Sequence, residues 1–128
     1  MADQKDAGLE RMGEEFLEFV HEEALRLDPE DQEALARLAE SYSRSGRHEE
    51  GLALDRRLIA LRPEGPVAHY HLACSLSRTY HEDEAVAELR RAIELGYADF
   101  DHMERDDDLE NVRKHPGWSA LLRESGRA

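Results

Sequence analysis

The sequence has few residues of several types, and each shortage excludes a class of protein. Its 128 residues include one cysteine, Cys74, which rules out an intramolecular disulfide and suits a reducing cytoplasm. No apolar run approaches the roughly 20 residues of a membrane helix. Only 17 basic residues, two of them lysines, oppose 30 acids, and the net charge of −13 disfavours nucleic acid and anionic lipid. We therefore expect a cytoplasmic protein with no nucleic-acid or membrane partner.

The sequence does contain an internal repeat of 34 residues. When Pro29–Leu61 is laid over Pro63–Leu95, fourteen of the 33 aligned pairs are identical, among them Leu38 with Leu72 and Ala39 with Ala73. A period of this length with helical spacing inside it is typical of a helix–turn–helix repeat. Such units bury their apolar stripes only by stacking on neighbours, which indicates a surface for binding other proteins.

Apolar periodicity and helix stop signals predict an all-α chain with a single domain over residues 8–124. Within it we expect an N-terminal helix over 8–28, repeat 1 over 29–62, repeat 2 over 63–96, and capping helices over 97–124. Residues 1–7 and 125–128 are expected to be disordered or loose ends.

The N-terminal helix has an apolar stripe but no partner helix of its own in the sequence. The stripe residues follow at spacings of three and four and therefore share one face: Leu9, Met12, Phe16, Phe19, Val20, Ala24 and Leu27. We expect this helix to cover the open side of repeat 1.

Repeat 1 resembles the tetratricopeptide repeat. Its first helix has the family's bulky, leucine, small and tyrosine positions, followed by a turn glycine, a small residue early in the second helix and a closing proline: Leu35, Leu38, Ala39, Tyr42, Gly46, Gly51 and Pro63. Repeat 2 matches at Leu72 and Ala73 but has His69 at the bulky position and Tyr80 in place of the turn glycine. Residues 12–29 look like a lone second helix, which would make them a half unit.

The C-terminal segment Glu94–Leu122 is similar to the terminal unit of many small bacterial tetratricopeptide proteins. The matching motifs are a Gly-Tyr turn, an Asp-Phe-Asp helix start and a close of the form Pro-x-Trp-x-x-Leu-Leu: Gly96-Tyr97, Asp99-Phe100-Asp101 and Pro116–Leu122. The resemblance implies that this segment caps the last repeat.

The resemblance as a whole implies a right-handed α-α superhelix whose first helices line a concave groove for a peptide or partner protein. In the repeat register, the candidate groove residues are Arg37, Glu40, Arg44, Tyr70, His71, Cys74 and Arg78. Chaperone-binding members of the family hold a carboxylate with Lys and Asn at set positions. Arg37 and His71 occupy the places where Asn would be expected, so we do not expect such a clamp.

Two interpretations of Arg44 and Arg78 remain open. Because they lie one repeat apart, they should point the same way and could together grip an acidic peptide. Alternatively, each neutralises nearby glutamates and the C-terminal end of its own helix. The second interpretation is the one we favour.

Other chemistry-bearing residues predict no cofactor, metal or catalytic site. The seven histidines lack partners at ligand spacing, and Cys74 has no assignable His-plus-acid frame. Asp106–Asp108 lacks the glycine and glutamate of a calcium loop, so helix capping is the better account. Trp118 is expected to anchor the core of the cap, with partner binding as the minority interpretation.

We therefore predict a protein–protein interaction module, an adaptor or scaffold rather than an enzyme. One alternative is a structural homodimer that associates through the Phe16 and Phe19 helix or through the Trp118 end. A less favoured alternative is a small hydrolase that uses clustered carboxylates and histidine.

Overall fold

The protein is described from a computed structural model, which covers the backbone of residues 2–127 and the side chains of residues 8–127. Within that range the chain forms only helices and contains no strand. In chain order they are α1 (Ala2–Leu27), α2 (Gln32–Arg44), α3 (His48–Leu61), α4 (Pro66–Arg78), α5 (Glu82–Glu94), α6 (Phe100–Arg105), the 3₁₀ helix η1 (Asp107–Leu109), α7 (Glu110–Arg113) and α8 (Pro116–Glu124).

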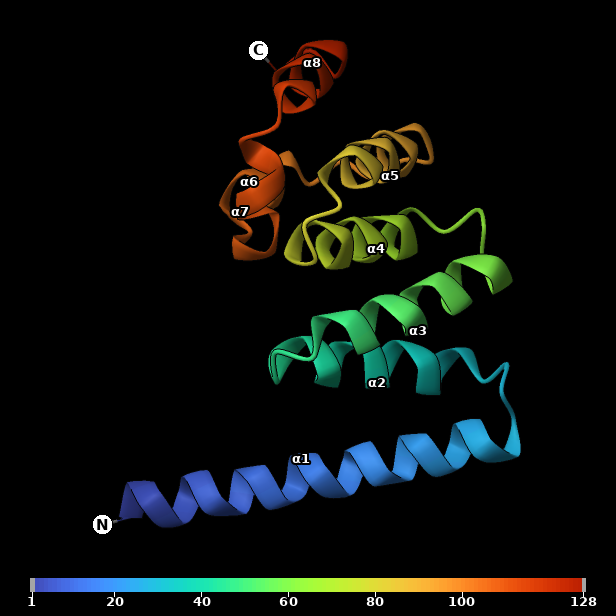
Figure 1. The fold of residues 1–128 in the computed structure, drawn as a ribbon, viewed down its shortest axis with the longest axis vertical. Coiled ribbons are helices and arrows are strands. Elements are labelled where there is room, and N and C mark those ends of the chain that lie inside the picture. Colours follow the sequence, from blue (N-terminus) through green and yellow to red (C-terminus); the bar gives the residue numbers. More distant parts are fainter. Residues whose placement is uncertain (1, 128) are drawn as a thin grey trace.

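The helices stack into a solenoid (Figure 1). Helices α1 to α5 lie one above the next, each packed on its chain neighbour, and α6, η1, α7 and α8 close the upper end against α4 and α5. Pairs α2–α3 and α4–α5 correspond to the two repeats, and the predicted all-α helical solenoid is confirmed. None of the described helices is both long and apolar enough to cross a membrane.

The same hydrogen-bonded cap ends the first helix of each repeat. After α2, the Arg47 N–H donates to the Tyr42 carbonyl at 2.8 Å and Gly46 adopts φ +81°. After α4, the His81 N–H donates to the Leu76 carbonyl at 2.8 Å and Tyr80 adopts φ +63°. These are the features of a Schellman cap, in which glycine is usual because the left-handed backbone costs it nothing. Repeat 2 keeps the turn geometry although a tyrosine stands in the glycine position.

Most of the core lies in repeat 2 and the cap. One buried cluster joins α4 and α5 to the cap through Leu76, Leu89, Met103, Val112 and Leu121. The Trp118 side chain is only 7 % exposed and belongs to this cluster. Trp118 is therefore a core anchor of the cap, and its ring is not presented to a partner. A smaller cluster joins α1, α2 and α3.

Both chain ends are more regular than expected. Helix α1 starts at Ala2, so the expected irregular segment 1–7 is helical wherever its backbone is described, while Met1 lies outside the described residues. Extending an existing helix adds one hydrogen bond per residue ordered, which offsets the cost of Gly8 and Gly13.

At the C-terminus, Ser125–Arg127 form a cap on α8 instead of a loose tail. The Arg127 N–H donates to the Leu122 carbonyl at 2.8 Å, and its guanidinium lies 4.5 Å from the centre of the Phe100 ring. Ala128 lies outside the described residues.

The largest departure from the expected packing is the orientation of α1. Helix α1 does cover repeat 1, but most of the predicted stripe does not make the contact. Leu25 is buried against α2 and α3 with Ala24 beside it, Glu18 is paired with Arg47, and the Tyr42 hydroxyl donates to Glu22 at 3.1 Å. Phe16 and Phe19, which were expected to face repeat 1, are 64 % and 58 % exposed. The Arg47 and Tyr42 side chains, at and just after the end of α2, find acidic partners on this face of α1.

Candidate functional site

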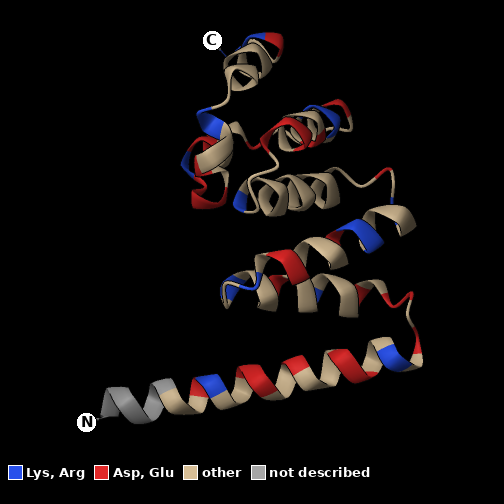
Figure 2. Ribbon diagram, viewed as in Figure 1, with Lys and Arg blue, Asp and Glu red and all other residues tan. Residues whose placement is uncertain are grey.

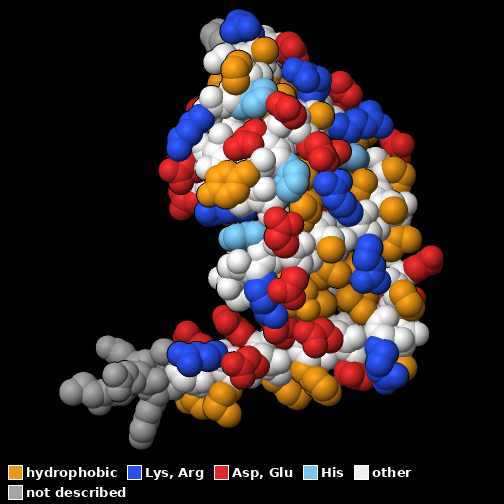
Figure 3. Space-filling model, viewed as in Figure 1, with side chains coloured by type: hydrophobic (Ala, Val, Ile, Leu, Met, Phe, Trp, Pro, Cys, Tyr) orange, Lys and Arg blue, Asp and Glu red, His pale blue; other side chains and the backbone are white. Residues whose placement is uncertain are grey.

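A hollow of about 470 Å³ lies on the concave side of the solenoid. Its walls come from α2, α3 and α4 and from the cap segment around α6 and η1. Figure 3 shows it as a notch in the left-hand edge, between the cap above and the end of α2 below. We call this hollow the groove. Because both repeats and the cap contribute to it, the groove exists only when these three parts are stacked.

Five of the seven candidate groove residues line this hollow: Glu40, Arg44, Tyr70, His71 and Cys74. Glu40, Arg44 and His71 are exposed, whereas Tyr70 and Cys74 are buried in the wall. The structure does not place Arg37 or Arg78 among the lining residues. A molecule in the groove would therefore contact the three exposed side chains directly, while the two buried ones shape the wall.

Each of the three candidate arginines already has an acidic partner. Arg44 Nη1 lies 2.8 Å from Glu40 Oε1, and Arg37 Nε lies 3.9 Å from Glu33 Oε1, both within one helix. Arg78 Nε binds Asp108 Oδ1 at 2.9 Å and so ties α4 to the cap. Arg44 thus pairs locally with a glutamate, as expected, whereas Arg78 pairs with an aspartate of the cap, and the two arginines do not form a free cationic pair.

An aromatic wall separates the groove from the core. The Tyr70 and Tyr97 rings are stacked with centroids 4.4 Å apart, and the Tyr70 hydroxyl donates to Asp106 Oδ2 at 2.5 Å. The other Asp106 oxygen, Oδ1, accepts the Asp108 N–H at 3.0 Å and begins η1, as helix capping requires. Burial, with added effects from the nearby Cys74 and Asp106, raises the pKa of Tyr70, so its phenol stays neutral.

Asp55 forms part of the groove wall on α3 and was not among the candidate residues. It is buried, and its Oδ2 accepts a hydrogen bond of 2.5 Å from the Ser75 hydroxyl. Burial raises the pKa of Asp55, while the Ser75 hydrogen bond opposes that effect. The repeat alignment held a signal for it, because Asp55 aligns with the apolar Leu89 of repeat 2. An acid at a core position of a repeat is a candidate for function.

Acids dominate the charge of the groove. Its lining contains one arginine, Arg44, against four acids: Glu40, Asp55, Asp106 and Asp108. His71 and His102 are also in the lining, and both are exposed. This excess of carboxylates favours a basic over an acidic ligand.

One cluster of side chains in the groove wall could in principle share a metal ion. One sulfur or carboxylate oxygen from each of Cys74, Asp106 and Asp108 lies within 4.8 Å of the other two. Each already has a protein partner, however. Asp108 is held by Arg78, and Asp106 accepts from both Tyr70 and, at 3.8 Å, the Cys74 thiol. Burial first, and then the negative charges of Asp106 and Asp108, raise the pKa of Cys74 well above its usual value. A protonated thiol is a poor metal ligand and a poor nucleophile.

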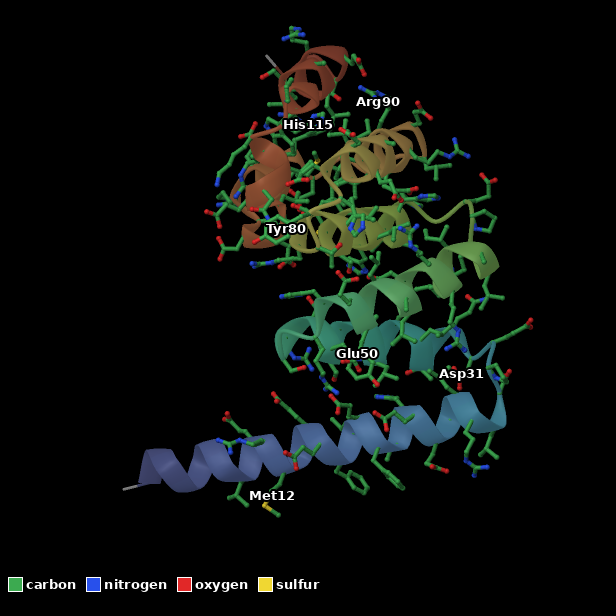
Figure 4. All side chains as sticks on the ribbon, in the orientation of Figure 1. Met12, Asp31, Glu50, Tyr80, Arg90 and His115 are labelled. Atoms are coloured by element: carbon green, nitrogen blue, oxygen red, sulfur yellow. The ribbon has the colours of Figure 1, made fainter. Side chains whose placement is uncertain are left out.

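A second, shallower hollow of about 680 Å³ lies at the junction of the repeat 2 turn and the cap. Tyr80, Lys114 and His115 contribute to it, and Figure 4 labels Tyr80 and His115 beside α4 and the cap. His115 Nε2 lies 2.6 Å from Asp83 Oδ1 and fastens the start of α5 to the cap. Unlike the groove, this hollow is lined only by the turn of repeat 2, the start of α5 and the cap, and it contains none of the candidate residues.

Comparison with known proteins supports the fold more than the function. No family model matches the sequence. Over 86 residues the chain is 31 % identical to a chloroplastic protein of Arabidopsis thaliana, a match that covers 65 % of this chain and 26 % of that protein. The chain thus spans about a quarter of this relative's length.

Among solved structures, the MamA RS-1 ArsTM double mutant matches with a TM-score of 0.62 over 98 % of this chain and 75 % of that chain. MamA contains tetratricopeptide repeats. This protein has a tetratricopeptide-like fold. At 16 % identity the likeness concerns the arrangement of helices and not the residues that line the groove.

Proposed function

We propose that the protein is a non-enzymatic interaction module that binds a basic segment of a partner protein in its groove. The observation that carries the proposal is the composite acidic hollow of 470 Å³ built from both repeats and the cap. Concave hollows with a few convergent polar groups are the usual binding sites of proteins. The tetratricopeptide-like fold of the chain supports a protein as the ligand.

The charge of the chain supports a basic partner. The net charge is −13, and residues 1–34 carry twelve acids against three bases. A field of one sign speeds encounter with partners of the other sign and weakens as salt is added. We therefore expect binding to the groove to weaken with ionic strength.

The groove chemistry supports binding rather than catalysis. A catalytic site needs a nucleophile, a base that activates it and donors that stabilise the developing charge. The thiol of Cys74 is kept protonated by burial and by neighbouring carboxylates. The Tyr70 phenol and the Asp106 carboxylate are occupied by each other. A cytoplasmic location and the absence of a cofactor belong to the same proposal.

A charge reversal in the groove tests the proposal. The groove variant carries two substitutions at exposed lining residues, Glu40→Arg and His71→Arg. The control variant, Glu50→Arg with Ala53→Arg, changes the net charge by the same amount. The control residues are exposed on α3 and outside the groove. Exposed ion pairs such as Glu40–Arg44 contribute little to stability, so both variants should fold.

The measurement has two stages. Cross-linking of the purified protein in a lysate of its source organism identifies bound segments, and titration calorimetry then measures a synthetic peptide of the segment found. We expect the groove variant to lose at least tenfold in affinity and the control to lose little. Equal binding by both variants, or binding that strengthens as salt is added, would overturn the proposal.

A further inference from the structure

The outward face of α1 is an apolar surface that no side chain among residues 8–127 covers. It consists of seven side chains, each 40–76 % exposed: Leu9, Met12, Phe16, Leu17, Phe19, Val20 and Leu27. We call this set the outer stripe. In Figure 4 the Met12 side chain points away from the rest of the molecule, and Figure 3 shows hydrophobic side chains along the underside of α1. The opposite face of α1, which carries Glu18, Glu22 and the buried Leu25, is the face that packs on repeat 1.

The outer stripe is as large as one side of a stable protein interface. Since a large apolar side chain carries on the order of 200 Å² of surface, seven of them exposed by about half add up to roughly 800 Å². A typical specific interface buries about 800 Å² on each partner. The largest apolar patch on an ordinary monomer is only about 300–600 Å². The stripe therefore exceeds what a solvated surface helix usually exposes.

The spacing of the stripe is symmetric. Six of its seven residues fall in pairs at equal distances from residue 18: Leu9 with Leu27, Phe16 with Val20, and Leu17 with Phe19. Two copies of such a helix can therefore pair antiparallel about a two-fold axis level with residue 18. In that pairing Leu9 meets Leu27 of the second copy, Phe16 meets Val20, and Leu17 meets Phe19. Self-complementarity of this kind is what a two-fold interface requires.

We propose that a second copy of this chain covers the outer stripe through antiparallel pairing of the two α1 helices. The one acid within the stripe fits this register, because Glu23 falls opposite Gly13 of the second copy, where there is no side chain to meet it. A Cβ added at Gly13 would touch nothing in the monomer, so packing within the monomer does not require a glycine at this position. Glu23 is held in place by Arg26 at 3.0 Å.

The position of α1 leaves room for a second copy. Helix α1 has 26 residues and α2 only 13, and the N-terminal part of α1 runs past the end of α2 (Figure 1). Helix α1 is also the outermost layer of the solenoid at this end, so a second solenoid can approach without meeting the groove.

The charges beside the stripe give the dimer a distinctive salt dependence. Figure 2 shows acids spread along α1, and each copy of the chain has a net charge of −13. In the antiparallel pairing, the two acidic helices lie side by side and repel each other. Salt screens this repulsion and slightly favours apolar burial. The dimer should therefore become more stable as ionic strength rises. A basic partner helix on the same stripe would instead bind more weakly as ionic strength rises.

Sedimentation velocity on the purified full chain tests the pairing. We expect a dimer at micromolar concentrations, as interfaces of this size usually give, and a dimer fraction that rises between low and high NaCl. Phe16→Glu with Val20→Glu should make the protein monomeric. The matched control is Val67→Glu, an exposed valine on α4, which should leave the dimer intact. A wild-type protein that stays monomeric throughout, or a dimer that survives the double change, overturns the proposal.

Cysteine cross-linking tests the register. In a Cys74→Ser background, Leu9→Cys and Leu27→Cys are made as separate proteins and oxidised alone or mixed. The antiparallel pairing predicts a disulfide-linked dimer in the mixture and almost none in either protein alone. Cross-linking of each variant with itself, and not in the mixture, would contradict the proposed register.

Discussion

The two repeats have helices of nearly equal length, the same cap after the first helix and nearly the same motif, yet they differ sharply in burial. Helix α4 of repeat 2 has eight buried residues, whereas α2 of repeat 1 has four. The difference comes from their neighbours. Repeat 2 lies between repeat 1 and the apolar face of the cap, while repeat 1 has on its outer side a helix that presents acids. In a solenoid, the stability of a unit depends on its interfaces as much as on its own sequence.

Two residues 34 positions apart can therefore be substituted as a matched pair, because they occupy equivalent places in the two repeats but have different neighbours. The largest difference is expected at Leu76 and Tyr42. Leu76 is fully buried, so Leu76→Ala should lower the free energy of unfolding by about 2–5 kcal/mol. Tyr42 is only half-buried, and Tyr42→Ala should cost about 1 kcal/mol. Urea unfolding at one fixed protein concentration checks both; equal losses would mean that the repeats are equally supported.

The next largest difference is expected at Ser77 and Ser43, which are identical residues in the two repeats. Ser77 is 0 % exposed, and its hydroxyl accepts the Val112 N–H at 3.2 Å across the cap interface. Ser77→Ala leaves that buried N–H without a partner and should cost about 1–3 kcal/mol. Ser43→Ala, in the groove wall, should change stability by less than about 0.5 kcal/mol. If Ser43→Ala lowered the free energy of unfolding as much as Ser77→Ala, the two repeats would not differ in support at this position.

The helix boundaries could be predicted from sequence because they depend on local signals. Asp31 caps α2, Pro66 begins α4, and Gly46 allows the left-handed turn, all within a few residues of the feature they specify. The repeat register likewise identified five of the residues that line the groove. These inferences need no knowledge of what lies across an interface.

What the sequence did not reveal depends on tertiary neighbours. The apolar stripe of α1 was expected to face repeat 1, but the face with Glu18, Glu22 and Leu25 packs on it instead. Asp106 enters the groove from the cap, and no periodicity relates the cap to the repeats. Asp55 could have been predicted from the sequence, because it is an acid at the position where repeat 2 has the apolar Leu89.

The turn residues Tyr80 and Gly46 offer a smaller test of the same comparison. Tyr80 has a left-handed backbone and is 74 % exposed, so Tyr80→Gly relieves backbone strain and loses little packing. We expect a gain of about 1 kcal/mol. Gly46→Ala should lose about 1 kcal/mol for the same reason, because a Cβ at Gly46 touches nothing and only its φ opposes a side chain. Thermal unfolding of both variants checks the signs; a loss with Tyr80→Gly would show that the tyrosine side chain stabilises the turn.

The smallest effect, and the one tied to the groove, is expected at Asp55 and its repeat 2 counterpart Leu89. Burial raises the pKa of Asp55, so between the unfolded pKa of about 3.9 and the higher folded value the native state holds more protons than the unfolded state. The free energy of unfolding must then fall as pH rises through that window. Asp55→Asn removes the ionisation and can keep the hydrogen bond with Ser75.

The advantage of Asp55→Asn over the wild type should therefore be least below about pH 4, grow through the window and stay constant above it. Urea unfolding at a series of pH values, with Leu89→Met as a nearly volume-neutral control, measures this directly. The control should differ from the wild type by a constant amount, because no carboxyl is lost. If the Asp55→Asn difference is equally flat, the carboxyl has the same pKa in both states. The acidic groove would then hold a freely ionised Asp55, whose charge costs the fold nothing and adds to the attraction for a basic segment.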